Sequence, residues 1–245
     1  MPLKLFAMIN IYGRPAETEA TIKSLNDSEI APDTLLYLFV IPTPELSYDA
    51  VIKYLEYNRF DDVIVKYLDR KAPVSECYIE ALIEFRNSDA EYFASIDNDV
   101  LFNPDWFQTL EQVKESLEYD GNQCGILNPI NVPHGAYMPK QMPSYVIKKR
   151  MAGCVQVIPR KAALELPIDK KDTLWKRSPK DWSVCNFLYQ KGYTHASTII
   201  SSAQHIGKKG NGMSERSWVK RGRGGEGFTP HEKIKYLWSC FNGSN

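Results

Sequence analysis

The first hundred residues alternate between short apolar runs and helical patterns, and this alternation is the strongest constraint on the fold. The run from residue 3 to 12 is apolar and rich in β-formers, Gly13-Arg14-Pro15 interrupts it, and residues 17–25 have a helical pattern. Further predicted strands lie at 35–41, 62–68 and 92–96, with predicted helices at 48–57 and 74–85. Strands that alternate with helices form right-handed βαβ units. We therefore expect an α/β fold with a mostly parallel central sheet and helices on both faces.

Beyond residue 100 the alternation continues with shorter elements. The predicted elements are a helix at 105–117 that begins at Pro104, strands at 125–130, 155–158 and 198–201, and helices at 182–190 and 231–238. From residue 207 onward the sequence is rich in glycine and basic residues. We expect one domain over residues 1–206, built from halves at 1–100 and 101–206, followed by a basic glycine-rich flexible segment and a C-terminal helix at 207–245.

Charge is distributed unevenly along the 245 residues, although the formal net charge is zero. Residues 1–139 contain 10 basic and 23 acidic side chains, and residues 140–245 contain 20 basic and 7 acidic ones. A basic half of this kind attracts polyanions through the field of the whole protein. Two solvated faces that neutralise each other after folding would give the same counts. The sequence leaves both interpretations open.

The sequence also lacks the features of several protein classes. No apolar stretch approaches the roughly 18–20 residues that a membrane span needs, and residues 1–12 lack the basic start and cleavage site of a signal peptide. The five cysteines are far apart and form no CxxC pair, so we expect buried free thiols rather than zinc or redox sites. These absences predict a cytoplasmic protein without a membrane span.

Two aspartates separated by one residue follow the fourth predicted strand. Asp97-Asn98-Asp99 comes directly after this strand and shortly before Pro104. In open α/β sheets, ligands bind beyond the carboxyl ends of the strands. Two carboxylates at such an edge need a counter-charge, and a divalent cation shared with a diphosphate supplies one. The alternative is a solvated turn in which Asn98 or Asp99 caps the backbone.

Two further polar residues have positions that suit a site at this edge. His205 ends the last apolar segment, and a neutral imidazole nitrogen can complete a divalent metal site. Asp181 opens the predicted helix 182–190, where a carboxylate either caps the helix or acts as a general base toward a hydroxyl. A lone histidine and a capping aspartate are both common structural features, so neither decides the function alone.

Two segments have the composition of phosphate-binding elements. Tyr12-Gly13-Arg14 follows the first strand and could hold a nucleotide by backbone and ring contacts, with Arg14 near phosphate. The basic segment 208–223 could close over a phosphate or contact an anionic acceptor. The candidate residues for these acceptor or phosphate contacts are Trp182, Lys208, Lys209, Arg221 and Arg223.

In this order, the motifs resemble those of the GT-A-fold glycosyltransferases, particularly the inverting family-2-like enzymes that use nucleotide-activated sugars. The similar segments are residues 9–15, Asp97-Asn98-Asp99, residues 153–160, and the predicted helix from Trp182 with its Gly192-Tyr193 ending. The resemblance covers roughly residues 3–207.

This chain departs from the family pattern at two places. Residues 39–44 lack the consecutive acids that hold the base or ribose. The acidic loop before the third helix is replaced by residues 70–73, which leaves Asp69 as the nearest carboxylate.

The resemblance implies a role for each candidate residue. Asp99 and His205 would bind Mn²⁺ or Mg²⁺, and Asp181 would be the general base. The expected contacts to the donor, a nucleoside-diphosphate sugar and most readily a UDP-sugar, come from Ile11, Tyr12, Gly13, Arg14, Asp69, Asp97 and Asn98. Residues 1–100 would form the nucleotide-sugar half of a catalytic domain, and residues 101–206 the acceptor half. The implied reaction is direct displacement at an anomeric carbon with inversion.

The identity of the acceptor stays open in the sequence. A basic half suits a polyanion, and DNA carrying a hydroxylated base is one candidate. A carbohydrate or lipid-linked acceptor is the other. Outside this family, a nucleotidyltransferase would need a Gly-rich basic signature at the first turn, of which only Gly13-Arg14 is present. A non-enzymatic nucleic-acid-binding protein would leave Asp97 and Asp99 without a role.

Overall fold

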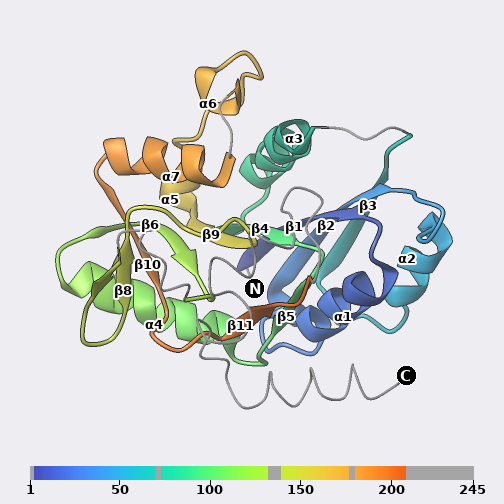
Figure 1. Cartoon of the computed structure of the whole chain (residues 1–245), viewed down its shortest axis with the longest axis horizontal. Helices are drawn as coiled ribbons and strands as arrows, with labels where there is room; N and C mark the ends of the chain where they lie inside the picture. The colour runs from blue at the N-terminus through green and yellow to red at the C-terminus, as the bar shows by residue number, and fades with distance from the viewer. Residues whose placement is uncertain (1–2, 70–72, 132–138, 177–179, 208–245) are drawn as a thin grey trace, which may run out of the picture.

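A nine-stranded sheet forms the centre of the protein (Figure 1). The structure is a computed structural model that describes residues 3–69, 73–131, 139–176 and 180–207. The strand order is β3-β2-β1-β4-β9-β6-β10-β8-β7, and β5 and β11 form a separate two-stranded sheet. The strands are β1 (Leu5–Tyr12), β2 (Thr34–Ile41), β3 (Asp62–Tyr67), β4 (Tyr92–Asp97), β5 (Val100–Phe102), β6 (Gln123–Asn128), β7 (Lys140–Gln141), β8 (Val146–Lys148), β9 (Val155–Pro159), β10 (Tyr193–Ser197) and β11 (Ala203–His205).

Helices cover both faces of this sheet, as the sequence predicts (Figure 1). They are α1 (Pro15–Asn26), α2 (Tyr48–Tyr54), α3 (Val74–Asn87), α4 (Trp106–Tyr119), α5 (Arg160–Ala163), α6 (Thr173–Lys176) and α7 (Lys180–Gln190), with a 3-10 turn at Ala31–Asp33. Apolar residues of α1, α2 and α4 pack on one face, and those of α3, α5 and α7 pack on the other.

The central strands are buried on both sides, which explains their continuous apolar sequences. In β1, Leu5, Ala7 and Ile9 belong to the core on one face, and Phe6 and Met8 belong to the core on the other. Side chains alternate across a strand, so a strand covered by helices on both faces has few positions for polar residues. Every residue of β2 is buried for the same reason.

Strand directions confirm the mostly parallel sheet. β1 pairs in parallel with β2 and β4, β2 pairs in parallel with β3, and β6 pairs in parallel with β10. β9 lies between β4 and β6 and runs antiparallel to both. The carboxyl ends of β1 and β4 therefore lie side by side, with Asn10 in register with Asp97.

Some predicted boundaries are wrong. Residues 198–201 are not a strand. β10 pairs with β6 and ends at Ser197, and β11 pairs with β5 and begins at Ala203, so residues 198–201 connect two strands of different sheets. Pro104 does not begin α4, which starts at Trp106. The Pro104 carbonyl instead accepts a hydrogen bond from the Glu29 N–H at 2.9 Å, so this residue belongs to the turn before the helix.

The structure also bears on the predicted state of the cysteines and on the predicted lack of a membrane span. The four cysteines in the described residues are free thiols, as predicted; Cys77, Cys124 and Cys185 are buried, whereas Cys154 is only partly buried. Within the described parts of the chain, no helix combines the length and apolar character needed to cross a membrane. The predicted helix at 231–238 lies outside the described residues.

Candidate functional site

The end of β4 and the start of β5 position the two aspartates of the Asp97-Asn98-Asp99 motif. Asp97 is the last residue of β4, where its N–H donates to the Cys154 carbonyl at 2.8 Å, and Asp99 immediately precedes β5. β11 pairs antiparallel with β5 and sets His205 opposite Val100. The Ile206 N–H donates to the Asp99 carbonyl at 2.8 Å. A strand from much later in the sequence therefore places an imidazole beside the aspartates.

Asp97, Asp99 and His205 form a cluster of possible metal ligands. One oxygen from each carboxylate and one imidazole nitrogen lie within 4.8 Å of one another. Asp99 is only 1% exposed, His205 is half-buried, and Asp97 is exposed. Two carboxylates and an imidazole are donors that Mn²⁺ and, through the oxygens, Mg²⁺ accept. The chemistry of the donor set therefore fits a divalent cation.

The Asp99 carboxylate lies between two basic side chains. Arg14 Nη1 forms an ion pair with Asp99 Oδ2, and His205 Nε2 lies 2.9 Å from Asp99 Oδ1. Both oxygens are buried, and each faces one of these basic side chains. A buried carboxylate is favourable only beside positive charge, and a divalent cation is a partner of that kind. The buried carboxylate of Asp99, together with Asp97 and His205, therefore suits a divalent cation.

A turn after β1 brings Arg14 to Asp99. Gly13 and Arg14 have φ angles of 63° and 55°, in the left-handed region, before α1 starts at Pro15. Asn98 Nδ2 donates to Thr18 Oγ1 at 2.8 Å and to the Gly13 carbonyl at 3.3 Å. The Asn98 amide thus links the turn after β1 to the turn after β4, and its hydrogen bonds hold the two turns together.

Gly207 completes the surroundings of Asp99. A Cβ atom at this position would overlap Asp99 Oδ2 and would lie 2.9 Å from Arg14 Nη1. Sequence analysis gave this glycine no role, because the contact depends on the pairing of β11 with β5. The close approach means that any larger residue at position 207 would displace the carboxylate or the guanidinium.

Asp181 lies in the first turn of α7, where it packs against Gly153. A Cβ atom at Gly153 would lie 2.9 Å from Asp181 Cβ and 3.0 Å from Asp181 Oδ2. Burial raises the pKa of the Asp181 carboxyl to about 6, the Trp182 N–H lowers it, and the negative charge of Asp97 raises it. Asp181 is therefore close enough to Asp97 to be coupled to it electrostatically. Its pKa suits a general base that works near neutral pH.

The pKa of Asp97 is set by opposing influences. Loss of solvent around the carboxylate raises it, although part of the residue reaches the surface, and the positive charges of His205 and Arg14 lower it. Asp97 thus interacts electrostatically both with the basic groups around Asp99 and with the carboxylate of Asp181.

Arg150, which the sequence did not single out, lies over the ring of the residue that follows Asp181. The guanidinium of Arg150 is 4.5 Å from the ring centroid of Trp182, the residue after Asp181. The run Lys148-Lys149-Arg150 is visible in the sequence, but short basic runs are usually solvated, so it carried no signal.

The structure does not bring every candidate to this cluster. Ile11 is fully buried in the core, so only its backbone can reach a ligand. Tyr12 is half-buried at the end of β1. Asp69 is exposed beyond β3, and β2 and β1 separate that strand from β4. Lys208, Lys209, Arg221 and Arg223 lie outside the described residues.

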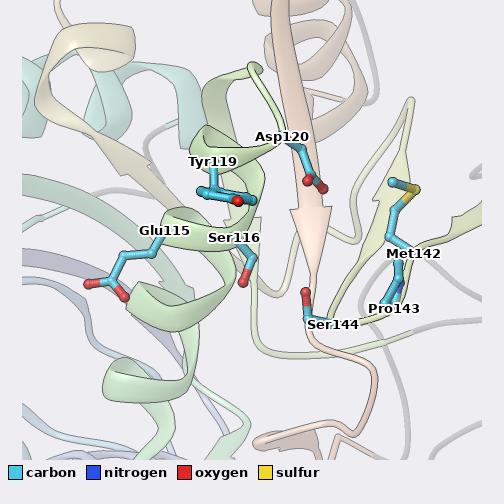
Figure 2. Close-up of a pocket in the computed structure, with 7 residues that line it drawn as sticks. All are labelled: Glu115, Ser116, Tyr119, Asp120, Met142, Pro143 and Ser144. Atoms are coloured by element: carbon cyan, nitrogen blue, oxygen red, sulfur yellow. The ribbon is translucent and has the colours of Figure 1, made fainter.

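A separate pocket of about 570 Å³ lies near β7 and β8, the last two strands in the order of the sheet (Figure 2). Its lining comes from the end of α4 and from the turn between β7 and β8, and consists of Glu115, Ser116, Tyr119, Asp120, Met142, Pro143 and Ser144. Because α4 ends just before β6 begins, the pocket lies toward the amino end of β6. None of the candidate residues lines it.

Known protein structures with a similar fold were found by comparison. No family model and no curated protein matches the sequence. The mannosyltransferase PcManGT from Pyrobaculum calidifontis, solved with GDP-Man and Mn²⁺, is similar with a TM-score of 0.59 and 12% identity, over 100% of this chain and 71% of that one. The chain has a GT-A-like fold.

Two structures of S. aureus TarS show the same GT-A-like fold. TarS 1–349 has a TM-score of 0.56 and 10% identity, over 98% of this chain and 79% of that one. A longer TarS structure has a TM-score of 0.56 and 12% identity, over 84% of this chain and 37% of that one. At these identities the likeness shows the fold alone.

Proposed function

We propose that the protein is a metal-dependent glycosyltransferase that moves a sugar from a nucleoside-diphosphate sugar to an acceptor hydroxyl. One observation carries the proposal: Asp97, Asp99 and His205 converge within 4.8 Å at the carboxyl end of β4, and Asp181 lies close enough to act on Asp97. The GT-A-like fold supports it, since the mannosyltransferase with that fold was solved with GDP-Man and Mn²⁺.

In this proposal, Asp99 and His205 hold Mn²⁺ or Mg²⁺, and Asp97 contacts the metal or the donor. When bound, the cation supplies positive charge that stabilises the departing diphosphate. Arg14 already lies against Asp99, so its guanidinium is available to the same phosphates once they enter. The turn of Gly13 and Arg14 holds the nucleotide beside β1.

Asp181 accepts the proton of the attacking hydroxyl. A pKa of about 6 leaves the carboxylate ionised at neutral pH and still basic enough to take the proton as the new bond forms. Attack on the anomeric carbon from the side opposite the diphosphate gives inversion. This stereochemical outcome is part of the proposal and is tested by the anomeric configuration of the product.

The nucleotide and the acceptor are the finer parts of the proposal. We predict a UDP-sugar from the family resemblance, whereas the similar mannosyltransferase binds GDP-Man, so both donors belong in a test. A hydroxylated base in DNA remains a prediction from the charge distribution of the sequence, with a carbohydrate or lipid-linked acceptor as its alternative.

Thermal melting with a panel of nucleoside diphosphates tests the proposal. Ligands that bind only the native state raise the melting temperature. We expect GDP or UDP to stabilise the protein in the presence of Mn²⁺ and to have little effect without it, and we expect slow release of sugar from the matching nucleotide sugar. A flat response across the panel, with and without Mn²⁺, would overturn the proposal.

A further inference from the structure

The segment between β8 and β9 places an arginine over the ring of Trp182, the residue that follows the candidate base. This segment is held against the start of α7 at two points: the Met151 N–H donates to Cys185 Sγ at 3.3 Å, and Gly153 packs against the Asp181 side chain. Arg150 precedes these contacts and lies over the Trp182 ring. The arginine is therefore fixed in a part of the chain that also fixes Asp181.

Trp182 faces away from the other apolar residues of α7. Val184, Cys185 and Leu188 pack in the core on the α3 side of the sheet, whereas Trp182 packs against the core on the α1 and α4 side. The indole ring thus packs on the other side of the sheet from the remaining apolar residues of α7. Arg150 lies over this ring.

The Trp182 ring covers one face of the Arg150 guanidinium, and the Nε of this group has no hydrogen-bond partner among the described residues. Arg150 is half-buried, and its Nε is fully buried without a hydrogen-bond partner in the described residues. No carboxylate of the described residues forms an ion pair with it. Buried donors without partners are rare in proteins and call for an explanation. A planar guanidinium stacked on an aromatic ring is suited to bind a carboxylate or phosphate through two parallel hydrogen bonds.

The two preceding lysines have contacts that differ from those of Arg150. Lys148 is buried, and its Nζ donates to Asn131 Oδ1 at 2.8 Å. Lys149 Nζ lies 5.0 Å from the ring centroid of Tyr189, about two turns along α7 from Asp181. Both lysines therefore hold the segment in place away from the candidate base. Arg150 alone in this run combines proximity to Trp182 with an unpartnered buried nitrogen.

We propose that Arg150 binds an anionic group, a phosphate or a carboxylate, on the acceptor next to the hydroxyl that Asp181 deprotonates. This inference rests on the proposed function. It makes Arg150 a specificity-determining residue: neutral acceptors would lack the partner that the guanidinium is placed to bind.

The test measures binding of three small sugars to the full chain saturated with Mn²⁺ and the stabilising nucleoside diphosphate. Glucose 6-phosphate and glucuronate carry the two anionic groups, and glucose is the neutral probe. Titration calorimetry is performed on the wild type, Arg150→Gln, Arg150→Lys and the matched control Lys149→Gln. Melting temperatures and nucleoside diphosphate affinity are measured for each variant.

We expect the wild type to bind at least one anionic sugar about tenfold or more tightly than glucose, as loss of a charge-assisted hydrogen bond implies. Arg150→Gln should abolish this preference, Arg150→Lys should restore part of it, and Lys149→Gln should keep it. Which anionic sugar binds more tightly distinguishes phosphate from carboxylate.

Three results would overturn the inference. The wild type could fail to prefer either anionic sugar, Lys149→Gln could lose the preference as fully as Arg150→Gln, or Arg150→Gln could weaken nucleoside diphosphate binding, which would place the arginine on the donor. Failure of the proposed function would look different, because Mn²⁺-dependent nucleotide binding would then be absent from the wild type.

Discussion

Two carboxylates at the same edge of the sheet, Asp99 and Asp181, have opposite electrostatic surroundings. Asp99 is buried between the basic side chains of Arg14 and His205. Asp181 has no basic partner among the described residues, and both burial and the charge of Asp97 raise its pKa. The first carboxylate faces positive charge, as the proposed metal ligand should, and the second has the raised pKa that the proposed base needs. In the proposed function, the surroundings of an aspartate, rather than its type, separate the two roles.

Replacement of Asp99 should have the largest effect. Asp99→Asn removes the buried charge that Arg14 and His205 face, so Mn²⁺-dependent release of sugar from the donor should fall at least about 100-fold. Steady-state rates at several Mn²⁺ concentrations measure this. The exposed Asp89→Asn variant is the control and should match the wild type. Equal rates in the two variants would show that Asp99 has no part in the chemistry.

Replacement of Asp181 should come next and should affect a different step. Asp181→Asn should lower the rate of sugar transfer, to water or to an acceptor, by about 10²–10⁴-fold and leave Mn²⁺-dependent nucleotide binding intact. In the wild type, kcat should fall as the pH drops below about 6, because the carboxyl becomes protonated. A pH profile of kcat for both proteins checks this. A profile that keeps its acid limb in Asp181→Asn would remove Asp181 from the role of base.

Substitutions at two glycines would disturb Asp99 and Asp181 separately. Gly207→Ala introduces a methyl group against Asp99 and Arg14, and Gly153→Ala introduces one against Asp181. We expect Gly207→Ala to weaken Mn²⁺ affinity about tenfold, and Gly153→Ala to lower kcat with little change in Mn²⁺ affinity. Calorimetric Mn²⁺ titration and initial rates separate these outcomes. If both variants change the same quantity, the two carboxylates belong to one function.

The smallest effect concerns stability. A carboxyl whose folded pKa, about 6, exceeds its ordinary value of 3.8 contributes its full stability below pH 4 and loses it as the pH rises through 6. Asp181→Asn should therefore raise the free energy of unfolding at pH 8 by about 1–2 kcal/mol, allowing for partial solvent exposure, and have little effect at pH 3.5. Urea denaturation at both pH values measures this. Destabilisation at pH 8 would contradict the raised pKa.

Local patterns account for what the sequence could predict. β1, β2 and β4 and their helices follow from apolar runs and their interruptions, because these strands are buried on both faces. The position of Asp97 and Asp99 follows from the same pattern, since a polar pair after a buried strand must lie at its carboxyl end.

The contacts around the candidate residues depend on strand pairings between distant parts of the sequence, which the sequence does not predict. β9 inserts antiparallel between β4 and β6, and β11 pairs with β5, and neither arrangement leaves a local signal. These pairings position Gly153 against Asp181 and Gly207 against Asp99. The ring contact between Arg150 and Trp182 likewise joins two segments that are separate in the sequence. The candidate residues could be named singly, but their surroundings required the folded chain.

Electron paramagnetic resonance of Mn²⁺ tests the central claim most directly, because bound Mn²⁺ loses the sharp signal of the free ion. We expect one Mn²⁺ site per chain that tightens when the nucleoside diphosphate is added. This site should weaken strongly in both Asp99→Asn and His205→Ala, whereas Asp181→Asn should retain it. Unchanged Mn²⁺ binding in Asp99→Asn and His205→Ala, or no binding by the wild type, would contradict it.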